Sequence, residues 1–131
     1  MISSETNTQI KDLIKLQKQA KQRKKSGLFV AEGLKMLAEA AEYGKLQKIY
    51  VAEHKMQNPD EVLESLCRNY PCETVSDAVF KQISETVTPQ GVLGLVQIPV
   101  YSLECLLQDA RHRYLLLDDL RDPGNLGTVM R

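Results

Sequence analysis

Apolar and polar residues follow one another along this chain in blocks that predict helices and short strands in turn. Between residues 7 and 25, apolar side chains recur at helical spacing with lysines beside them, which predicts an amphipathic helix that Gly27 ends. The same reasoning predicts helices at residues 34–43, 58–69, 76–86 and 102–107, and strands at residues 28–31, 48–52, 72–75, 92–98 and 114–117. Because strands and helices alternate, the sequence predicts the α/β fold class.

The last segment of the chain, residues 115–131, carries the most specific pattern. A run of leucines leads into Pro123-Gly124, which predicts a tight turn, and Asn125 is suited to cap the helix that follows. Gly127 and Arg131 are four residues apart, so they lie on one helix face, where the glycine leaves room for a ligand beneath the arginine. Loops between a strand and a helix bind ligands in open α/β sheets, but a plain turn, cap and surface arginine explain the same residues. The sequence ends inside this predicted helix, so we expect a fragment of a longer enzyme.

Charge is distributed unevenly along a chain whose formal net charge is zero. The first 25 residues hold seven basic side chains against Glu5 and Asp12, whereas the remainder is acidic overall. A basic segment on an acidic body indicates contact with a polyanion at one end, although a solvated helix face has the same composition. Aromatic residues are scarce beside the lysines, which favours recognition of a polyanion's backbone and shape over stacking.

Composition also argues against several classes of protein. The first fifteen residues are polar and no apolar stretch is long enough to cross a bilayer, so neither a signal peptide nor a membrane span is expected. The cysteines are odd in number and lack C-x-x-C spacing, which indicates reduced thiols in a cytoplasmic protein. His54 and His112 lack the spacing of metal ligands, so we expect no metal site and interpret both as surface residues. Asp118 and Asp119 are neighbours on a predicted strand and would point to opposite faces, which argues against a two-carboxylate catalytic site.

Three stretches together resemble one family of enzymes. Residues 115–131, with Asp122-Pro123-Gly124-Asn125-Leu126-Gly127 and an arginine four residues after the last glycine, are similar to the first signature motif of the SpoU (TrmH-type) RNA ribose 2′-O-methyltransferases, which belong to the knotted SPOUT class. Phe29-Val30-Ala31-Glu32-Gly33 after a basic helix, and Thr88-Pro89-Gln90-Gly91 before an apolar strand, resemble the substrate-binding domain of that family. The resemblance covers nearly the whole chain, from which the family's second and third motifs are absent.

The resemblance implies an architecture and a function. The architecture is an RNA substrate-binding domain at residues 1–100, with a mixed sheet flanked by helices as in certain ribosomal proteins, then a linker at 101–112 and the truncated start of a knotted α/β methyltransferase domain at 113–131. The parent protein is expected to transfer a methyl group from S-adenosylmethionine to a ribose 2′-hydroxyl of ribosomal or transfer RNA, as a homodimer formed through the knotted domain. The fragment is expected to supply RNA recognition, without activity, cofactor or metal of its own.

Site residues are assigned through the same motifs. The resemblance places catalysis on Asn125 and Arg131. Because a guanidinium does not normally lose its proton, we expect Arg131 to act by position and electrostatics rather than as a base. A structural role is the stronger interpretation for two of these residues, with Gly33 as a turn residue and Glu32 stabilising the start of the helix that follows. Ordinary turn chemistry also explains Thr88 and Gln90. Contacts to RNA are predicted for Lys11, Lys15, Lys18, Lys21, Arg23, Lys25, Glu32, Gly33, Thr88 and Gln90.

Other functions are compatible with these residues. One is a non-catalytic RNA-binding module that retains the fold. Another is an α/β protein that binds an anion or phosphate ligand at residues 122–131, where a helix begins. A purely structural interaction domain explains the chain less well, because it gives no reason for the basic amino-terminal segment.

Overall fold

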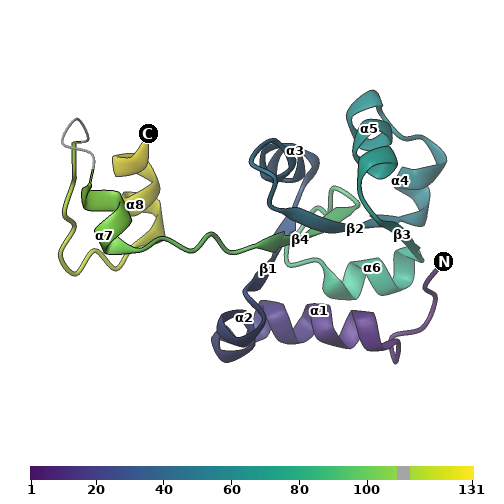
Figure 1. Ribbon diagram of the computed structural model, residues 1–131. Helices are drawn as coiled ribbons and strands as arrows, with labels where there is room; N and C mark the ends of the chain where they lie inside the picture. Colours follow the sequence, from purple (N-terminus) through teal and green to yellow (C-terminus); the bar gives the residue numbers. More distant parts are fainter. Residues whose placement is uncertain (109–112) are drawn as a thin grey trace. The chain divides into compact units, whose positions relative to one another are not determined.

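A computed structural model describes residues 1–108 and 113–131 (Figure 1). The chain divides into two compact units, Met1–Pro99 and Val100–Arg131. The end of the predicted linker and His112 lie outside the described residues. No helix in the described part of the chain has the length and apolar character needed to span a membrane.

The first unit is built around a four-stranded mixed sheet with the strand order β1-β4-β2-β3. Neighbours β1 and β4, and β4 and β2, are antiparallel, whereas β2 and β3 are parallel. The strands are β1 (Leu28–Glu32), β2 (Leu46–Ala52), β3 (Cys72–Val75) and β4 (Val92–Gln97). Each matches one of the first four predicted strands, and the predicted fold, a mixed sheet flanked by helices, is confirmed.

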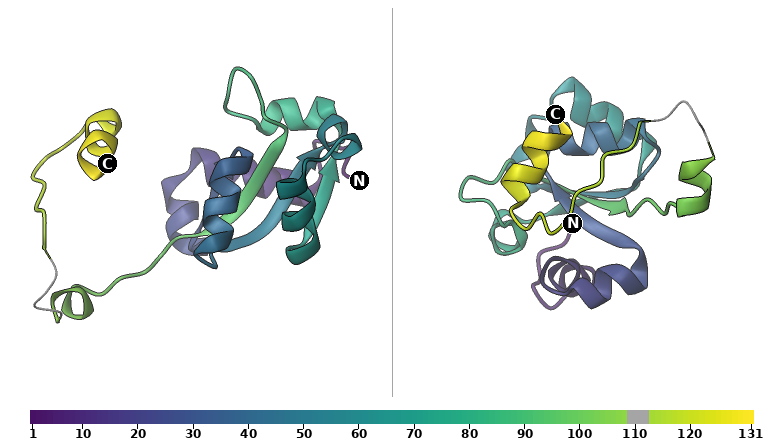
Figure 2. Two further views of the ribbon diagram at one scale, coloured as in Figure 1. Left: turned by 90° about the horizontal axis from the view of Figure 1, so that it is seen from above. Right: turned by 90° about the vertical axis from the view of Figure 1, so that its left-hand side faces the viewer.

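Helices cover both faces of this sheet (Figures 1 and 2). On one face lie α1 (Thr8–Lys18) and α6 (Asp77–Ile83), and on the other lie α3 (Leu34–Glu42) and α5 (Glu61–Asn69). Successive residues of β2 point to opposite faces, so Tyr50 packs with α1 and α6 while Ile49 and Val51 pack with α3 and α5. All three side chains are buried, because the strand lies between two helical layers.

Close packing of α3 on the sheet depends on a glycine in β4. A Cβ atom at Gly94 would lie 2.9 Å from Cγ of Leu37 and 3.0 Å from Cδ1 of Leu46, which is inside normal contact distance. Leu37 is the fully buried anchor of α3. A side chain at position 94 would therefore push the helix away from the sheet.

The single long helix predicted for the amino-terminal segment is wrong, because the structure divides it in two. Gln19 is extended (φ −121°, ψ 107°) and separates α1 from α2 (Ala20–Ser26). Nη1 of Arg23 donates hydrogen bonds to the carbonyl oxygens of Leu16 (2.8 Å) and Gln17 (2.7 Å) at the end of α1. These carbonyls would otherwise lack hydrogen-bond partners, because α1 ends here. The side chain of Arg23 therefore stabilises a break between the helices that hydrophobic periodicity does not reveal.

Other predicted helices differ at their ends. The helix expected from residue 58 begins only at Glu61, because the carboxylate of Asp60 accepts the N–H of Leu63 at 2.9 Å and caps it. Helix α6 ends at Ile83, short of the predicted residue 86. A further helix, α4 (Glu53–Gln57), follows β2 directly and was not predicted, since five residues are too few to show a helical period.

The second unit contains two helices among its described residues. Helix α7 (Leu103–Leu107) begins where predicted, because Oγ of Ser102 accepts the N–H of Cys105 at 3.1 Å. Helix α8 (Pro123–Met130) follows Asp122. The strand predicted at residues 114–117 is wrong: these residues are exposed and lie in no strand, because none of the strands described for residues 1–108 and 113–131 is paired with them.

Candidate nucleic-acid interface

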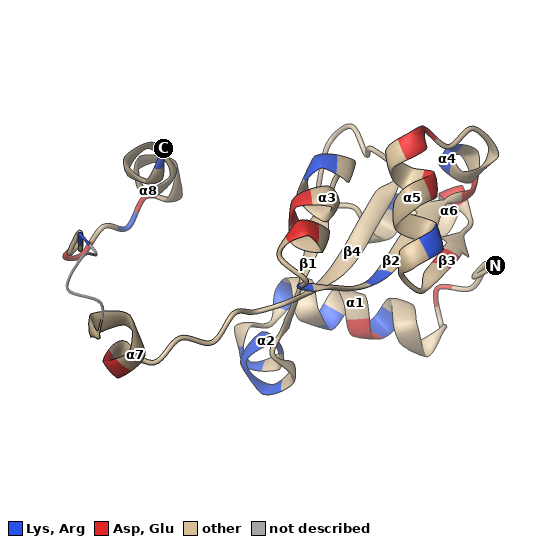
Figure 3. Cartoon of the chain, turned by 45° about the horizontal axis from the view of Figure 1, so that its top comes forward, with Lys and Arg blue, Asp and Glu red and all other residues tan. Residues whose placement is uncertain are grey.

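Exposed lysines line both amino-terminal helices (Figure 3). On α1 they recur at intervals of four and three residues, which places them on one helix face. Nζ of Lys15 lies 3.3 Å from the Asp12 carboxylate, and the other exposed lysines of these two helices have no ion pair within the described chain. We call this set the lysine cluster, and it consists of Lys11, Lys15, Lys18, Lys21, Lys24 and Lys25. Its largely uncompensated charge suits a polyanion.

Arg23 differs from the lysines around it. Its side chain is half-buried, and its Nη1 is committed to the two carbonyl oxygens at the end of α1. The guanidinium therefore fixes the angle between the two helices that carry the lysine cluster. The sequence placed Arg23 among the RNA contacts and gave no sign of this positioning role.

The remaining predicted contact residues meet at one end of the sheet. Gly33 follows β1, is buried and has φ 103°, and a Cβ atom there would lie 2.9 Å from Oε1 of Gln90. The Gly33 N–H also donates to the carbonyl oxygen of Val92 at 3.0 Å. Thr88 and Gln90 are exposed. The structure thus joins two segments that are far apart in sequence, and we call Glu32, Gly33 and residues 84–91 the loop cluster.

Glu32 holds the loop cluster together. Its half-buried carboxylate accepts hydrogen bonds from Oγ of Ser84 (2.6 Å), from Oγ1 of Thr86 (2.7 Å) and from the N–H of Glu85 (3.2 Å). With its oxygens occupied in this way, Glu32 positions the loop that carries Thr88 and Gln90. The predicted role of Glu32 at the start of α3 is therefore wrong, because its carboxylate binds this loop instead, and its role is nonetheless structural.

His54, to which the sequence assigned no functional role, lies beside the loop cluster. Nδ1 of His54 lies 2.7 Å from Oδ1 of Asp77, which also accepts the His54 backbone N–H at 3.2 Å. The side-chain hydrogen bond to His54 is the main cause that lowers the pKa of Asp77. Nε2 of His54 lies so close to Gly91 that a Cβ there would be 3.2 Å away. His54 was predicted as a surface residue and is exposed, but its partner Asp77 could be found only from the fold.

In the second unit, the terminal motif adopts a geometry that differs from the prediction at its start. Oδ2 of Asp122 accepts the N–H of Asn125 at 2.7 Å, so Asp122 and not Asn125 caps α8, and Pro123-Gly124 forms its first turn. The prediction of a separate turn is wrong, because proline is compatible with the first helical position. A Cβ at Gly127 would lie 3.9 Å from Nη2 of Arg131, so the arginine does extend over the glycine.

The second unit offers no enclosed site for a cofactor or metal among its described residues. Apart from Gly127, which is half-buried, every described residue of this unit is exposed, whereas small-molecule sites are concave and bury most of their ligand. These residues by themselves therefore do not fit S-adenosylmethionine. Across residues 1–108 and 113–131, no group of three or more histidine, cysteine or acidic side chains is placed to hold a metal ion.

Fold and surface together define an α/β domain with a mixed sheet between two helical layers and a basic pair of helices at its amino terminus. The family model of the MRM3-like substrate binding domain matches residues 7–94. The chain belongs to this family.

Two relatives extend the comparison. The chain is 32% identical over 130 residues to the 23S rRNA (guanosine(2553)-2′-O)-methyltransferase RlmP of Bacillus subtilis, covering 99% of this chain and 48% of the relative. Among solved structures, an rRNA methyltransferase from Sinorhizobium meliloti with bound S-adenosylmethionine superposes with a TM-score of 0.76 at 30% identity, covering 99% of this chain and 48% of that chain. The chain thus spans about half the length of these two relatives.

The SpoU methyltransferase AviRb from Streptomyces viridochromogenes shares the fold, with a TM-score of 0.61 at 15% identity over 77% of this chain and 37% of that chain. The family model and the B. subtilis relative confirm the predicted resemblance to RNA 2′-O-methyltransferases, and the comparison with AviRb shows that a SpoU methyltransferase has the same fold.

Proposed function

We propose that the Met1–Pro99 unit binds RNA on behalf of a SpoU-type methyltransferase. The observation that carries the proposal is the lysine cluster, exposed on two helices of a domain that matches a substrate-binding family. Lysines of this kind contact phosphates, position a nucleic acid and give binding a strong salt dependence. The relatives named as rRNA methyltransferases support RNA as the polyanion.

For the whole protein we propose transfer of a methyl group from S-adenosylmethionine to a ribose 2′-hydroxyl of ribosomal or transfer RNA, in the cytoplasm and as a homodimer formed through a knotted domain. The name of the B. subtilis relative, a 2′-O-methyltransferase of 23S rRNA, supports this reaction class. The chain described here supplies recognition and has no activity or bound cofactor of its own in this proposal.

Asn125 and Arg131 are the proposed catalytic residues. A ribose hydroxyl attacks poorly until its proton leaves or its developing negative charge is stabilised. Arg131, which extends over Gly127, stabilises that charge and orients the nucleotide as a fixed cation, while the amide of Asn125 supports the same nucleotide by hydrogen bonding. Neither residue acts as a base.

In the first unit, the proposed contacts divide into two groups. The lysine cluster meets the RNA backbone, and the exposed Thr88 and Gln90 of the loop cluster meet ribose or base edges. Arg23 and Glu32 position these contacts without touching the RNA themselves. Arg23 fixes α2 against α1, and Glu32 fixes the loop that carries Thr88.

Fluorescence anisotropy with a structured ribosomal RNA fragment, at two salt concentrations, tests this function. Replacement of Lys18 and Lys21 by glutamine should weaken binding and reduce the slope of log affinity against log salt by roughly one to two. The matched control removes two positive charges elsewhere, with Lys45→Gln and Arg68→Gln, and should leave the slope nearly unchanged. Equal losses in both variants, or no RNA binding at low salt, would overturn the proposal.

A further inference from the structure

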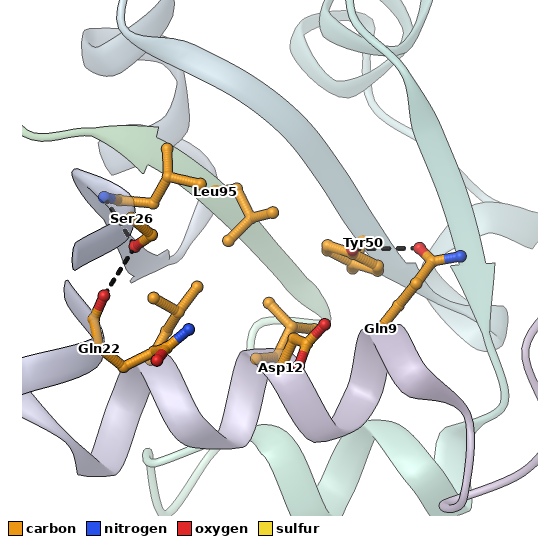
Figure 4. A pocket seen from close by; sticks show the side chains of 9 residues that line it. Gln9, Asp12, Gln22, Ser26, Tyr50 and Leu95 are labelled. Carbon is orange, nitrogen blue, oxygen red and sulfur yellow. Dashed lines mark hydrogen bonds between the residues drawn. The ribbon is translucent and has the colours of Figure 1, made fainter.

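A cleft of about 290 Å³ lies between the two amino-terminal helices and the sheet (Figure 4). The cleft exists because α1 does not continue into α2: the break at Gln19, held by Arg23, moves α2 aside. The β1 and β4 residues beneath it, Leu28 and Leu95, are consequently only half-buried. Its volume lies just below the range of about 300–1,000 Å³ for small-molecule sites, which suits a ligand the size of a single base.

The walls of the cleft are apolar and its rim is polar. Leu16, Leu28 and Leu95 supply flat aliphatic contact, while Asp12, Gln22 and Ser26 lie along the helical side. Figure 4 shows Gln9 closing one end, where its Oε1 accepts the hydroxyl of Tyr50 at 3.2 Å. Such a site offers apolar surface to the faces of a heterocycle and hydrogen-bonding groups to its edge, which is how proteins hold unstacked RNA bases.

Asp12 is the charged residue among those that line the cleft. One carboxylate oxygen, Oδ1, is bound by Lys15, and within the described chain Oδ2 has no hydrogen-bond partner. An ionised carboxylate only accepts hydrogen bonds, and it accepts two donors side by side. The Watson–Crick edge of guanine presents two adjacent donors, N1–H and the N2 amino group, whereas the edges of adenine, cytosine and uracil each present one.

Charge around the cleft suits a nucleotide and not a free base. The helices that form its mouth carry the lysine cluster, and Lys15 binds the same carboxylate that would read the base. A phosphate attached to a base in the cleft would therefore lie near cationic side chains. Because the charges and the cleft belong to the same two helices, one nucleotide of a bound RNA satisfies both.

We infer that this cleft binds an unstacked guanine of the RNA, with the Asp12 carboxylate accepting from N1–H and N2–H and the leucines packing on the ring. The inference rests on the proposed RNA-binding function and adds a base-specific contact to it. The guanine is a recognition nucleotide held by the first unit, separate from the ribose that the second unit's motif would engage.

Titration of the isotope-labelled chain with guanosine, adenosine, cytidine and uridine 5′-monophosphates, followed by amide NMR shifts, tests the inference. Guanosine monophosphate should shift the amides of Asp12, Leu16, Ser26 and Leu95 and bind about tenfold more tightly than the other three. Asp12→Asn should remove that preference, because an amide presents one acceptor and one donor, while the control Glu39→Gln on α3 should retain it.

Two results would overturn the inference. One is an equal response to all four nucleotides and to inorganic phosphate, confined to the lysine cluster, which would leave the cleft empty. The other is a guanine preference that persists in Asp12→Asn. Both are distinct from failure of the proposed function, which would show as loss of salt-dependent RNA binding whatever the nucleotide preference.

Discussion

The Glu32 carboxylate and the Ser84 hydroxyl are joined by a hydrogen bond of 2.6 Å, which ties the end of β1 to the segment that follows α6. This bond and its two neighbours give the loop cluster a defined conformation without any regular secondary structure. A loop that presents polar groups to a ligand gains affinity when it is held in place before binding.

Replacing Glu32 with alanine should therefore affect both stability and RNA binding. Loss of the acceptor leaves one backbone N–H and two hydroxyls without their partner, so we expect unfolding free energy to fall by about 1–3 kcal/mol, measured by urea denaturation. RNA affinity should fall as well. The control Glu42→Ala removes an exposed carboxylate that has no hydrogen bond in the described chain and should change neither quantity.

Arg23→Gln should loosen α2 from α1. The shorter side chain leaves the carbonyl oxygens of Leu16 and Gln17 unpaired, so we expect a loss of about 1–3 kcal/mol and faster amide hydrogen exchange in residues 20–26. Lys24→Gln removes the same charge from an exposed neighbour and serves as the control. Equal effects of the two substitutions would show that charge, and not capping, explains the result.

Gly94→Ala should be destabilising by about 1–3 kcal/mol, because the new methyl group would lie within 3.0 Å of side-chain atoms of Leu37 and Leu46. Shortening Leu37 to alanine in the same chain should relieve the clash. The double variant is then more stable than the sum of the two single losses predicts. Strict additivity of the two changes, measured by denaturant unfolding, would contradict this account of the packing.

Acid unfolding should depend on Asp60. Its pKa is lowered below the ordinary value of 3.8, chiefly by the Leu63 N–H and then by Lys55. Since the folded state favours the carboxylate, the stability it contributes is complete above pH 3.8 and is lost as the pH falls through the lowered pKa. Asp60→Asn keeps the cap but should flatten this acid dependence, whereas Asp60→Ala should cost about 1 kcal/mol at neutral pH. Denaturant midpoints over the acid range measure both.

The three thiols should react at different rates with iodoacetamide. Burial, followed by the hydrogen bond with Cys67, raises the pKa of Cys72 to about 12, so its thiolate is scarce at mildly alkaline pH. Cys105 is exposed and should be modified first, with Cys72 last. Mass spectrometry of the partly modified protein gives the order. Preferential labelling of Cys72 in the folded chain would be inconsistent with the packing of β3.

Local pattern was sufficient for much of the fold. Strand β3 was predicted at residues 72–75, and the helix that begins after Ser102 was found from its cap, because a short apolar run and a capping serine are properties of adjacent residues. The order β1-β4-β2-β3 was not predicted, since pairing of β1 with β4 joins segments at opposite ends of the first unit. The predicted strand at 114–117 failed for the related reason that an apolar run forms a strand only beside a partner.

For the candidate site, the sequence by itself determined which residues carry charge and that the chain turns at Gly33, because both depend on side-chain type and local backbone preference. The lysines of the cluster, Gly33 and the Gly127–Arg131 spacing were all identified in this way. Only the tertiary structure decided that Glu32 holds Ser84 and Thr86, that Arg23 caps a broken helix, and that Asp12 borders a cleft. These roles arise from contacts between segments that folding brings together, and such contacts leave no periodic trace in the chain.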